Sequence, residues 1–415
     1  MATATYAPPP GPPPMQYAPP PGPPPMMYAP PPGPPPSTHT SAQPAPALPA
    51  CDTAAELATY VRASLPILAA RGWLPIPLPA DLSARYAALF SASSAFFALP
   101  PDAPAKTRCA APSGAAASDE GFAAIPGEKQ LITLRRTARA PGLLRDAAAD
   151  AWGVTGELFL HALEGIADTL ELADLAVFDE MAAEARGFEE SKRASSLLRL
   201  FRYERPPPEA SGGTKKIVAE SHKDIGLLTL VVGASPGLDA RDPATGAWVS
   251  VEDTPRGDTP GTEPRLTATL LAGQTLTYLT QGLYAAGVHR VSVLPARSPA
   301  PEDAHRFSLV FALRPATAAI VDTARFEASP LIPPFPPDAI FAEGTNTNYP
   351  LCSMRAQPAG ELMRAISARH WNVNVAPEVR EGQKAKLMVG VANDAAGQTE
   401  DKGKPDAEVP EHGLE

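Results

Sequence analysis

The sequence predicts a mixed α and β protein with a jelly-roll core, a helical region before the core, a helix after it and disordered tails. Apolar residues recur at helical spacing between residues 53 and 186, which predicts a helical first half. Short apolar or alternating runs follow, separated by Gly, Pro and Asp clusters, and this pattern is typical of antiparallel strands. About eight such strands can form two facing sheets with room for one small ligand between them.

Five segments are expected along the chain. They are a proline-rich disordered tail, an N-terminal helical region, the jelly-roll core, a C-terminal loop with a helix, and a disordered acidic tail, at residues 1–48, 49–195, 196–320, 321–381 and 382–415. Both tails are too biased in composition to bury a core of their own. The catalytic or binding unit is therefore expected between them.

The first tail contains the unit YAPPPGPPP three times, beginning at Tyr6, Tyr17 and Tyr28. Proline fixes φ and removes a backbone donor, so the repeats are expected to be extended polyproline II segments. Such a segment can be a ligand for a proline-recognising protein module, or it can serve only as a solubilising spacer.

Periodicity places the individual elements. Helices are expected in TAAELATYVRASLPILAARG, in DLSARYAALFSASSAFFALP, over about Leu143–Arg186 and over about Ala359–Trp371. GWLPIPL is expected to be extended, and GFAAIPGE is expected to be a loop before a strand at about Lys129–Arg135. Further strands are expected in SSLLRLFRYE, LLTLVVGA, AWVSVE, RLTATLLAGQTLTYLT, HRVSVL and RFSLVFALRP.

Charge and cysteine content limit the kinds of partner and the cellular compartment that are expected. The 415 residues carry a formal net charge of −10 with no basic run of note, so neither nucleic acid nor an anionic membrane is an expected partner. A small-molecule substrate is expected instead. The three cysteines are far apart in the sequence and form no paired framework, which favours a reducing compartment. No signal-peptide core or membrane-spanning run is found, so a cytoplasmic location is expected.

Two histidines and one aspartate stand in strand-like surroundings. His222 and Asp224 occur in SHKDIGLLTL, and His289 occurs in YAAGVHRVSV. Side chains two apart in a strand share a face, so His222 and Asp224 are expected to point together into the barrel, where one metal could join them to His289. Two imidazoles and one carboxylate are the facial triad of non-heme iron(II) oxygenases, because three protein ligands leave open positions.

A fourth and fifth candidate lie in HRFSLVF. Arg306 and Ser308 share a strand face, and they could hold a carboxylate through a planar fork of donors and a hydroxyl. An arginine in so apolar a run is costly to bury without an anionic partner. A dicarboxylic co-substrate would meet that need.

The ordered set His-x-Asp, His, Arg-x-Ser resembles the iron(II)/2-oxoglutarate-dependent dioxygenases, specifically the isopenicillin N synthase-like branch. LLRLFRYERP, LTQGLYAAGVHRV and RFSLVFALRP resemble flanking segments of that family, and the likeness extends over about Ala50–Val375. The resemblance implies a double-stranded β-helix core and an oxidoreductase that hydroxylates or otherwise oxidises a small organic substrate. It also implies Fe(II), dioxygen, and 2-oxoglutarate as the co-substrate that is decarboxylated to succinate.

The resemblance assigns roles to individual residues. His222, Asp224 and His289 would bind iron, Arg306 and Ser308 would hold the C5 carboxylate of 2-oxoglutarate, and Tyr203 would help orient the co-substrate. Phe201 departs from the family pattern, because many plant members have Asn at that position. Two turn-rich insertions, TPRGDTPGTEP and PARSPAPEDA, put the substrate specificity in doubt more than the catalysis.

Substrate contacts and the function class leave alternatives open. Arg199 and Phe201 share the strand face of Tyr203 and are candidate substrate residues, and Leu131 and Thr133 are weaker candidates for the pocket. An isopenicillin N synthase-like oxidase that does not use 2-oxoglutarate would share the same ligands. A zinc hydrolase is disfavoured because no HExxH-type helix occurs. A non-catalytic interaction protein using the proline-rich repeats is the remaining alternative.

Overall fold

The structure is a computed structural model that describes residues 48–112, 119–207, 214–253, 266–298, 300, 303–335 and 352–387. The chain divides into two units, residues 1–44 and residues 45–415, and every described residue belongs to the second. The proline-rich repeats, the insertion TPRGDTPGTEP, three residues of the insertion PARSPAPEDA and residues 388–415 lie outside the described residues.

Two antiparallel sheets form the centre of the second unit. In the larger sheet the order is β1 (Trp73–Pro77), β9 (Thr267–Ala272), β6 (Leu228–Gly233), β11 (His305–Leu313), β4 (Leu197–Glu204), β3 (Lys129–Leu134) and β2 (Gly121–Ile125). In the smaller sheet the order is β5 (Lys216–His222), β10 (His289–Val293), β7 (Leu238–Arg241) and β8 (Trp248–Ser250). A two-stranded pair, β12 (Ile320–Val321) with β13 (Gln357–Pro358), lies apart from both.

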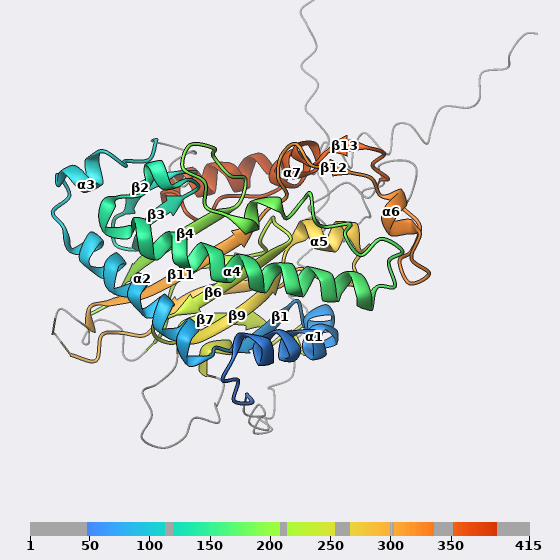
Figure 1. The fold of residues 1–415 in the computed structure, drawn as a ribbon. Helices are drawn as coiled ribbons and strands as arrows, with labels where there is room; N and C mark the ends of the chain where they lie inside the picture. The colour runs from blue at the N-terminus through green and yellow to red at the C-terminus, as the bar shows by residue number, and fades with distance from the viewer. Residues whose placement is uncertain are drawn as a thin grey trace, which may run out of the picture. The chain divides into compact units, whose positions relative to one another are not determined.

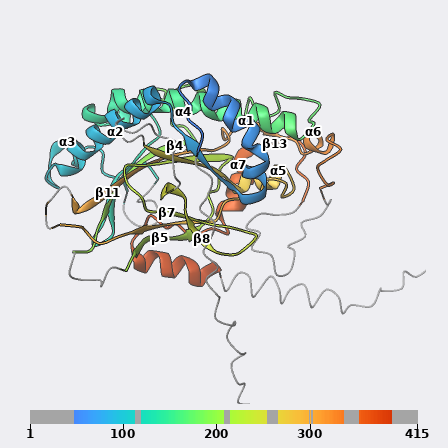
Figure 2. The ribbon, with the colours of Figure 1, turned by 90° about the horizontal axis from the view of Figure 1, so that it is seen from below.

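The two sheets face each other across an apolar layer that contains the pocket. Buried side chains from both sheets meet there, including Tyr203 and Val231 of the larger sheet and Val218, Leu238 and Val291 of the smaller one. Seen from below, β4 and β11 form one layer and β5, β7 and β8 form the other (Figure 2). Alternating side chains of each strand therefore point either into this layer or toward the outer covering.

Helices cover the outer face of the larger sheet (Figure 1). The covering helices are α1 (Ala54–Arg71), α2 (Ala80–Ala98) and α4 (Gly142–Thr169). Trp152 of α4 packs on Phe311 of β11 with ring centroids 4.4 Å apart. A hydrophobic core separate from the layer between the two sheets therefore lies between these helices and the larger sheet. A capping box of Thr53 and Glu56 begins α1, and Gly72, with a φ of 77°, ends it.

The remaining helices are short. They are α3 (Pro104–Thr107), α5 (Gln274–Leu279), α6 (Ala324–Glu327) and α7 (Ala359–Ser367), with single 3₁₀ turns at Thr137–Arg139, Ala183–Arg186 and Val251–Asp253. None of the described helices is long and apolar enough to cross a membrane. Cys51, Cys109 and Cys352 all lie within the described part of the chain and form no disulfide.

Three predicted elements differ from the structure. The helical block predicted to reach Arg186 ends at Thr169, where Glu171 adopts a φ of 51° that a helix cannot continue. RLTATLLAGQTLTYLT is not one strand, because Gly273 separates β9 from the helix α5. GFAAI, predicted as loop, forms β2 because it pairs with β3.

The C-terminal part of the described chain adds a helix at residues 377–387, drawn in red below β5 in Figure 2. Lys384 in this helix forms an ion pair with Glu220 of β5 at 2.5 Å, and Arg380 forms one with Glu128 at 2.6 Å. The helix therefore extends beyond residue 382, where the sequence predicts the disordered tail to begin.

Two glycines of α4 give a matched test of the packing between helix and loop. A Cβ at Gly156 would stand 1.9 Å from the carbonyl oxygen of Ala185, whereas a Cβ at Gly153 would meet nothing within 4 Å. Gly156→Ala is expected to lower the free energy of unfolding by about 1–3 kcal/mol through overpacking. Gly153→Ala is expected to raise it by up to about 1 kcal/mol through helix propensity. Denaturant titrations of both variants check this, and equal effects would contradict the close approach.

Candidate metal centre

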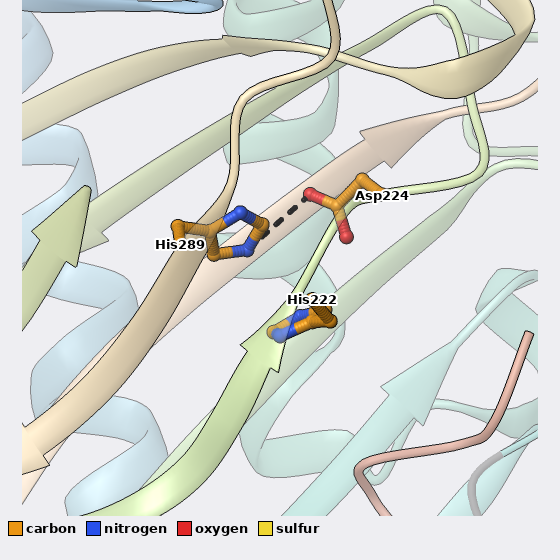
Figure 3. Close-up of side chains that lie close together, drawn as sticks. All are labelled: His222, Asp224 and His289. Carbon is orange, nitrogen blue, oxygen red and sulfur yellow. Dashed lines mark ion pairs between the residues drawn. The ribbon is translucent and has the colours of Figure 1, made fainter. Parts of the chain in front are cut away.

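His222, Asp224 and His289 come together at one end of the smaller sheet (Figure 3). His289 begins β10 and lies opposite His222, the last residue of β5, in the antiparallel register. One possible ligand atom of each residue lies within 4.8 Å of the others, and Nε2 of His289 is 3.8 Å from Oδ2 of Asp224. Among the described residues, this is the one group of His, Cys, Asp and Glu side chains that could hold a metal ion.

Asp224 reaches the group by a different route from the predicted one. The sequence places it two residues after His222 on the same strand face, but β5 ends at His222 and Asp224 lies in the following loop. Its backbone carbonyl accepts a hydrogen bond from the N–H of Gln274 at 2.8 Å, at the start of α5. The loop is therefore anchored on α5.

Backbone carbonyls orient both imidazole rings. Nδ1 of His222 lies 2.7 Å from the carbonyl oxygen of Glu220, and Nδ1 of His289 lies 3.1 Å from that of Gly287. A carbonyl oxygen can only accept, so each Nδ1 carries the proton and each Nε2 keeps its lone pair. Outer hydrogen bonds of this kind fix the tautomer that a metal-binding histidine needs.

Burial and mutual proximity set the charges of the group. Burial, together with the neighbouring His289, lowers the pKa of His222 to about 3, so the ring is neutral at physiological pH. Burial raises the pKa of Asp224, but His289 and His222 outweigh it and the net shift is downward. Oδ2 of Asp224 is buried and has no hydrogen-bond partner among the described residues. The neutral imidazole of His222 beside an ionised carboxylate with one unpartnered oxygen fits a divalent cation.

A pocket between the two sheets surrounds the group. Besides the three candidate ligands, its walls include Tyr203, Ser308, Arg199, Phe201, Val373 and Asn374. Phe201 stacks on Tyr203 with ring centroids 5.1 Å apart, and together the two rings form an apolar wall from β4.

Arg306 has an anionic partner inside the chain, which the sequence does not predict. Its Nη2 donates to Oε1 and Oε2 of Glu252 at 3.0 and 2.9 Å, and its Nε donates to the carbonyl oxygen of Ser235 at 3.0 Å. The buried arginine therefore has the anionic partner that its burial requires, and a co-substrate is not needed to supply it. Nη1 of Arg306 is buried and has no hydrogen-bond partner within the described chain, so one donor is left for a ligand.

Tyr203 lies beside Arg306 in the register of β4 and β11. Burial raises the pKa of its hydroxyl to about 12, against the opposing effects of Arg306 and the Ser308 hydroxyl. The phenol is therefore protonated at physiological pH and can donate a hydrogen bond. The guanidinium of Arg306 lies 5.5 Å from the centre of its ring.

The four candidate substrate residues separate into two groups. Arg199 and Phe201 line the pocket, whereas Leu131 and Thr133 are not among its lining residues. Leu131 pairs with Phe201 across the sheet, and Thr133 accepts a hydrogen bond from Nε of Arg199 at 2.9 Å. Burial, followed by repulsion from Arg135, lowers the pKa of Arg199 to about 10, so its guanidinium is charged at neutral pH.

Sequence reasoning missed three further residues near the site. Glu252 follows β8 directly before the first insertion, and no local pattern marks it as buried. Asn374 lines the pocket, and its Oδ1 is buried without a hydrogen-bond partner in the described structure. Lys129 is fully buried, and its Nζ donates to the carbonyl oxygens of Val218 and Val373 at 3.0 and 2.9 Å. It therefore ties β5 to the pocket-lining segment around Val373.

Comparison with solved structures identifies the fold. A full-length protein of Neurospora crassa, solved in complex with alpha-KG, matches over 76% of this chain and 91% of that chain, with 19% identity and a TM-score of 0.51. The complex of the same protein with alpha-KG and thymine matches over 77% and 93%, with 18% identity and a TM-score of 0.52. This chain has their fold.

A third structure agrees. A 2OG-Fe(II) oxygenase family protein from Caulobacter crescentus matches over 75% of this chain and 94% of that chain, with 22% identity and a TM-score of 0.50. No protein-family model matches the sequence, and no curated protein matches it. The arrangement of the two antiparallel sheets is therefore shared with these solved structures.

Lys129 gives the site a pH-dependent contribution to stability. Burial lowers the pKa of its ammonium from 10.5 to about 7, although Glu128 opposes the shift. Between about pH 7 and 10 the unfolded chain therefore binds more protons at this residue than the folded chain, and folding becomes more favourable as the pH rises. We expect the unfolding free energy of the wild type, relative to Lys129→Met, to increase by at most about 1.4 kcal/mol per pH unit over this range. Urea titrations at pH 7, 8 and 9 check the sign, and a constant difference would contradict it.

Proposed function

We propose that the chain is a non-heme iron(II)- and 2-oxoglutarate-dependent dioxygenase that hydroxylates or otherwise oxidises a small organic substrate. The observation that carries this proposal is the meeting of His222, Asp224 and His289 in one pocket between the two sheets. The shared fold with a structure that holds alpha-KG supports it. The reaction would couple substrate oxidation to the decarboxylation of 2-oxoglutarate to succinate.

The donor set fits iron. Nε2 of each histidine and a carboxylate oxygen of Asp224 would hold Fe(II), and three protein ligands leave positions open for co-substrate and dioxygen. When bound, the iron supplies the activation of dioxygen. The protein's part is to keep both imidazoles in the tautomer fixed by Glu220 and Gly287, and to keep Asp224 ionised.

The co-substrate subsite would lie on the wall formed by β4 and β11. Nη1 of Arg306, the hydroxyl of Ser308 and the hydroxyl of Tyr203 are three donors from adjacent register positions of these strands. They would hold the C5 carboxylate of 2-oxoglutarate, which leaves the oxo acid end to face the metal centre. Orientation of two reactants in one dry pocket is the main contribution a protein can make to such chemistry.

Substrate contacts are proposed for the remaining walls of the pocket. Arg199 and Phe201 of β4 and the amide of Asn374 line it without belonging to either the metal or the co-substrate group. The structurally similar Neurospora crassa protein has been solved with thymine and with 5-formyluracil, which are small molecules. A small-molecule substrate for this chain is consistent with a pocket enclosed between two sheets.

The finer organisation of the chain belongs to the same proposal. The strands of residues 196–320 would be the jelly-roll, or double-stranded β-helix, core of an isopenicillin N synthase-like enzyme, and the helical region 49–195 would add the covering helices together with β1, β2 and β3. We further propose a cytoplasmic location. The repeats in residues 1–48 would act as a spacer or as a ligand for a proline-recognising module.

One observation favours a second candidate, an oxidase that does not use 2-oxoglutarate. Glu252 already supplies Arg306 with a carboxylate, so the arginine does not require an anionic co-substrate. Strict dependence of oxygen consumption on added 2-oxoglutarate would exclude this candidate.

Removal of a metal ligand is expected to abolish turnover. Asp224→Ala and His289→Ala should each reduce iron-dependent formation of succinate from 2-oxoglutarate by at least about 100-fold, because even the loss of a partner that only orients a metal ligand costs about 10–100-fold. The measurement is succinate released per chain, with Fe(II), ascorbate and 2-oxoglutarate, because the decarboxylation can be followed without knowing the substrate.

His161→Ala is the matched control. This histidine lies on the exposed side of α4, with 56% of its side chain accessible, and it is expected to leave succinate formation unchanged. The proposed function would be contradicted if the Asp224→Ala and His289→Ala variants fold and keep wild-type turnover.

A further inference from the structure

The ion pair of Arg306 and Glu252 is almost completely withdrawn from solvent. Their side chains are 0% and 1% accessible. Both carboxylate oxygens of Glu252 accept from the same nitrogen of Arg306, and Oε2 also accepts from the backbone N–H of Leu238 at 2.7 Å. The carboxylate is thus held by the sheet as well as by the arginine.

Two glycines make room for this pair. A Cβ at Gly233 would stand 2.1 Å from Oε1 of Glu252, and a Cβ at Gly237 would stand 2.4 Å from Nε of Arg306. Any other residue at either position would push the carboxylate or the guanidinium away. The contact between Arg306 and Glu252 therefore depends on the backbone of β6 and of the segment that leads into β7, and not on two surface side chains that happen to meet.

The pair changes what the guanidinium can offer. Nε is engaged by Ser235 and Nη2 by Glu252, which leaves the buried Nη1 without a protein partner in the described chain. Tyr203 and Ser308 line the pocket, whereas Arg306 is not among its lining residues. A ligand carboxylate on this wall would therefore meet the hydroxyls of Tyr203 and Ser308 and only one guanidinium nitrogen, Nη1, in place of a two-nitrogen fork.

The charge at this wall is also altered. Arg306 alone would present one positive charge to an incoming dicarboxylate, but the charge of Glu252 compensates it within hydrogen-bonding distance. A buried pair of this kind is neutral as seen from the pocket, and in a low-dielectric interior the loss of one unit of charge changes anion binding strongly.

We propose that Glu252 is a built-in carboxylate that neutralises Arg306 and thereby sets the affinity and the specificity of the subsite for the tail of the oxo acid co-substrate. This inference rests on the proposed function. It assigns to Glu252 the role of a positioning residue, acting through Arg306. The subsite holds the tail of the oxo acid mainly by neutral hydrogen bonds, so it distinguishes only weakly between an oxo acid with an ionised tail and one without.

The test compares two oxo acids of equal chain length. Dissociation constants of 2-oxoglutarate and of 2-oxopentanoate, which lacks the tail carboxylate, are measured by anaerobic calorimetry on the full chain loaded with Fe(II). In the wild type we expect 2-oxoglutarate to bind no more than about 150-fold more tightly, roughly 3 kcal/mol, because three neutral hydrogen bonds contribute about 1 kcal/mol each.

Glu252→Gln removes the charge with little change of shape. It is expected to tighten 2-oxoglutarate about tenfold, because the arginine regains its charge toward the ligand, and to change the binding of 2-oxopentanoate by less than about threefold. Asp239→Asn is the matched control. It neutralises another buried carboxylate, one that accepts from Ser292 at 2.9 Å and Arg290 at 3.2 Å, and it should leave both constants unchanged.

The outcomes distinguish a failure of this inference from a failure of the proposed function. If neither the wild type nor Glu252→Gln binds 2-oxoglutarate with Fe(II), the proposed function and the inference both fall. If the wild type binds it with a preference above about 1,000-fold over 2-oxopentanoate, roughly 4 kcal/mol, the inference falls alone. The same holds if Glu252→Gln leaves the preference unchanged. The wild-type preference keeps the test decisive even if the variant does not fold.

Discussion

The antiparallel pairing of β5 with β10 is the constraint on which the site depends. This register sets His289 directly opposite His222, and it does so at the end of both strands, where the chain is free to turn. Asp224 then needs only a short loop to reach the same point, and the contact of its carbonyl with Gln274 holds that loop. Backbone geometry, more than any side-chain packing, brings the three ligand atoms within 4.8 Å of one another.

The larger sheet forms the opposite wall of the pocket. β4 and β11 run side by side at its centre, so residues at neighbouring register positions, Tyr203 with Arg306 and Phe201 with Ser308, line one strip of the interior. This strip must contain polar groups, and burying them is costly unless each has a partner. Glu252, Ser235 and the glycines at 233 and 237 meet most of that need for Arg306. Nη1 is the guanidinium nitrogen of Arg306 that has no hydrogen-bond partner in the described chain.

The sequence could predict the metal-ligand candidates because two histidines and an aspartate are a known ligand set, although the strand period of two does not place Asp224, which lies in the loop after β5. It could not predict Glu252, whose partner is 54 residues away and whose neighbours show no buried pattern. The strand predicted over QTLTYL is wrong. Its β-branched residues favour a strand, but the backbone N–H groups of Gln274 and Thr275 donate to the carbonyl oxygens of Asp224 and Ile225. In both cases the local structure depends on contacts with residues far away in the sequence, and local periodicity does not predict such contacts.

The most direct test of the account is a crystal structure of the chain grown anaerobically with Fe(II) and 2-oxoglutarate, with anomalous scattering recorded at the iron edge. The account predicts one iron peak within coordination distance of His222, Asp224 and His289, with the distal carboxylate of the co-substrate on Ser308, Tyr203 and Nη1 of Arg306. Absence of iron from this group of three, in crystals where the chain is folded as described, would contradict it.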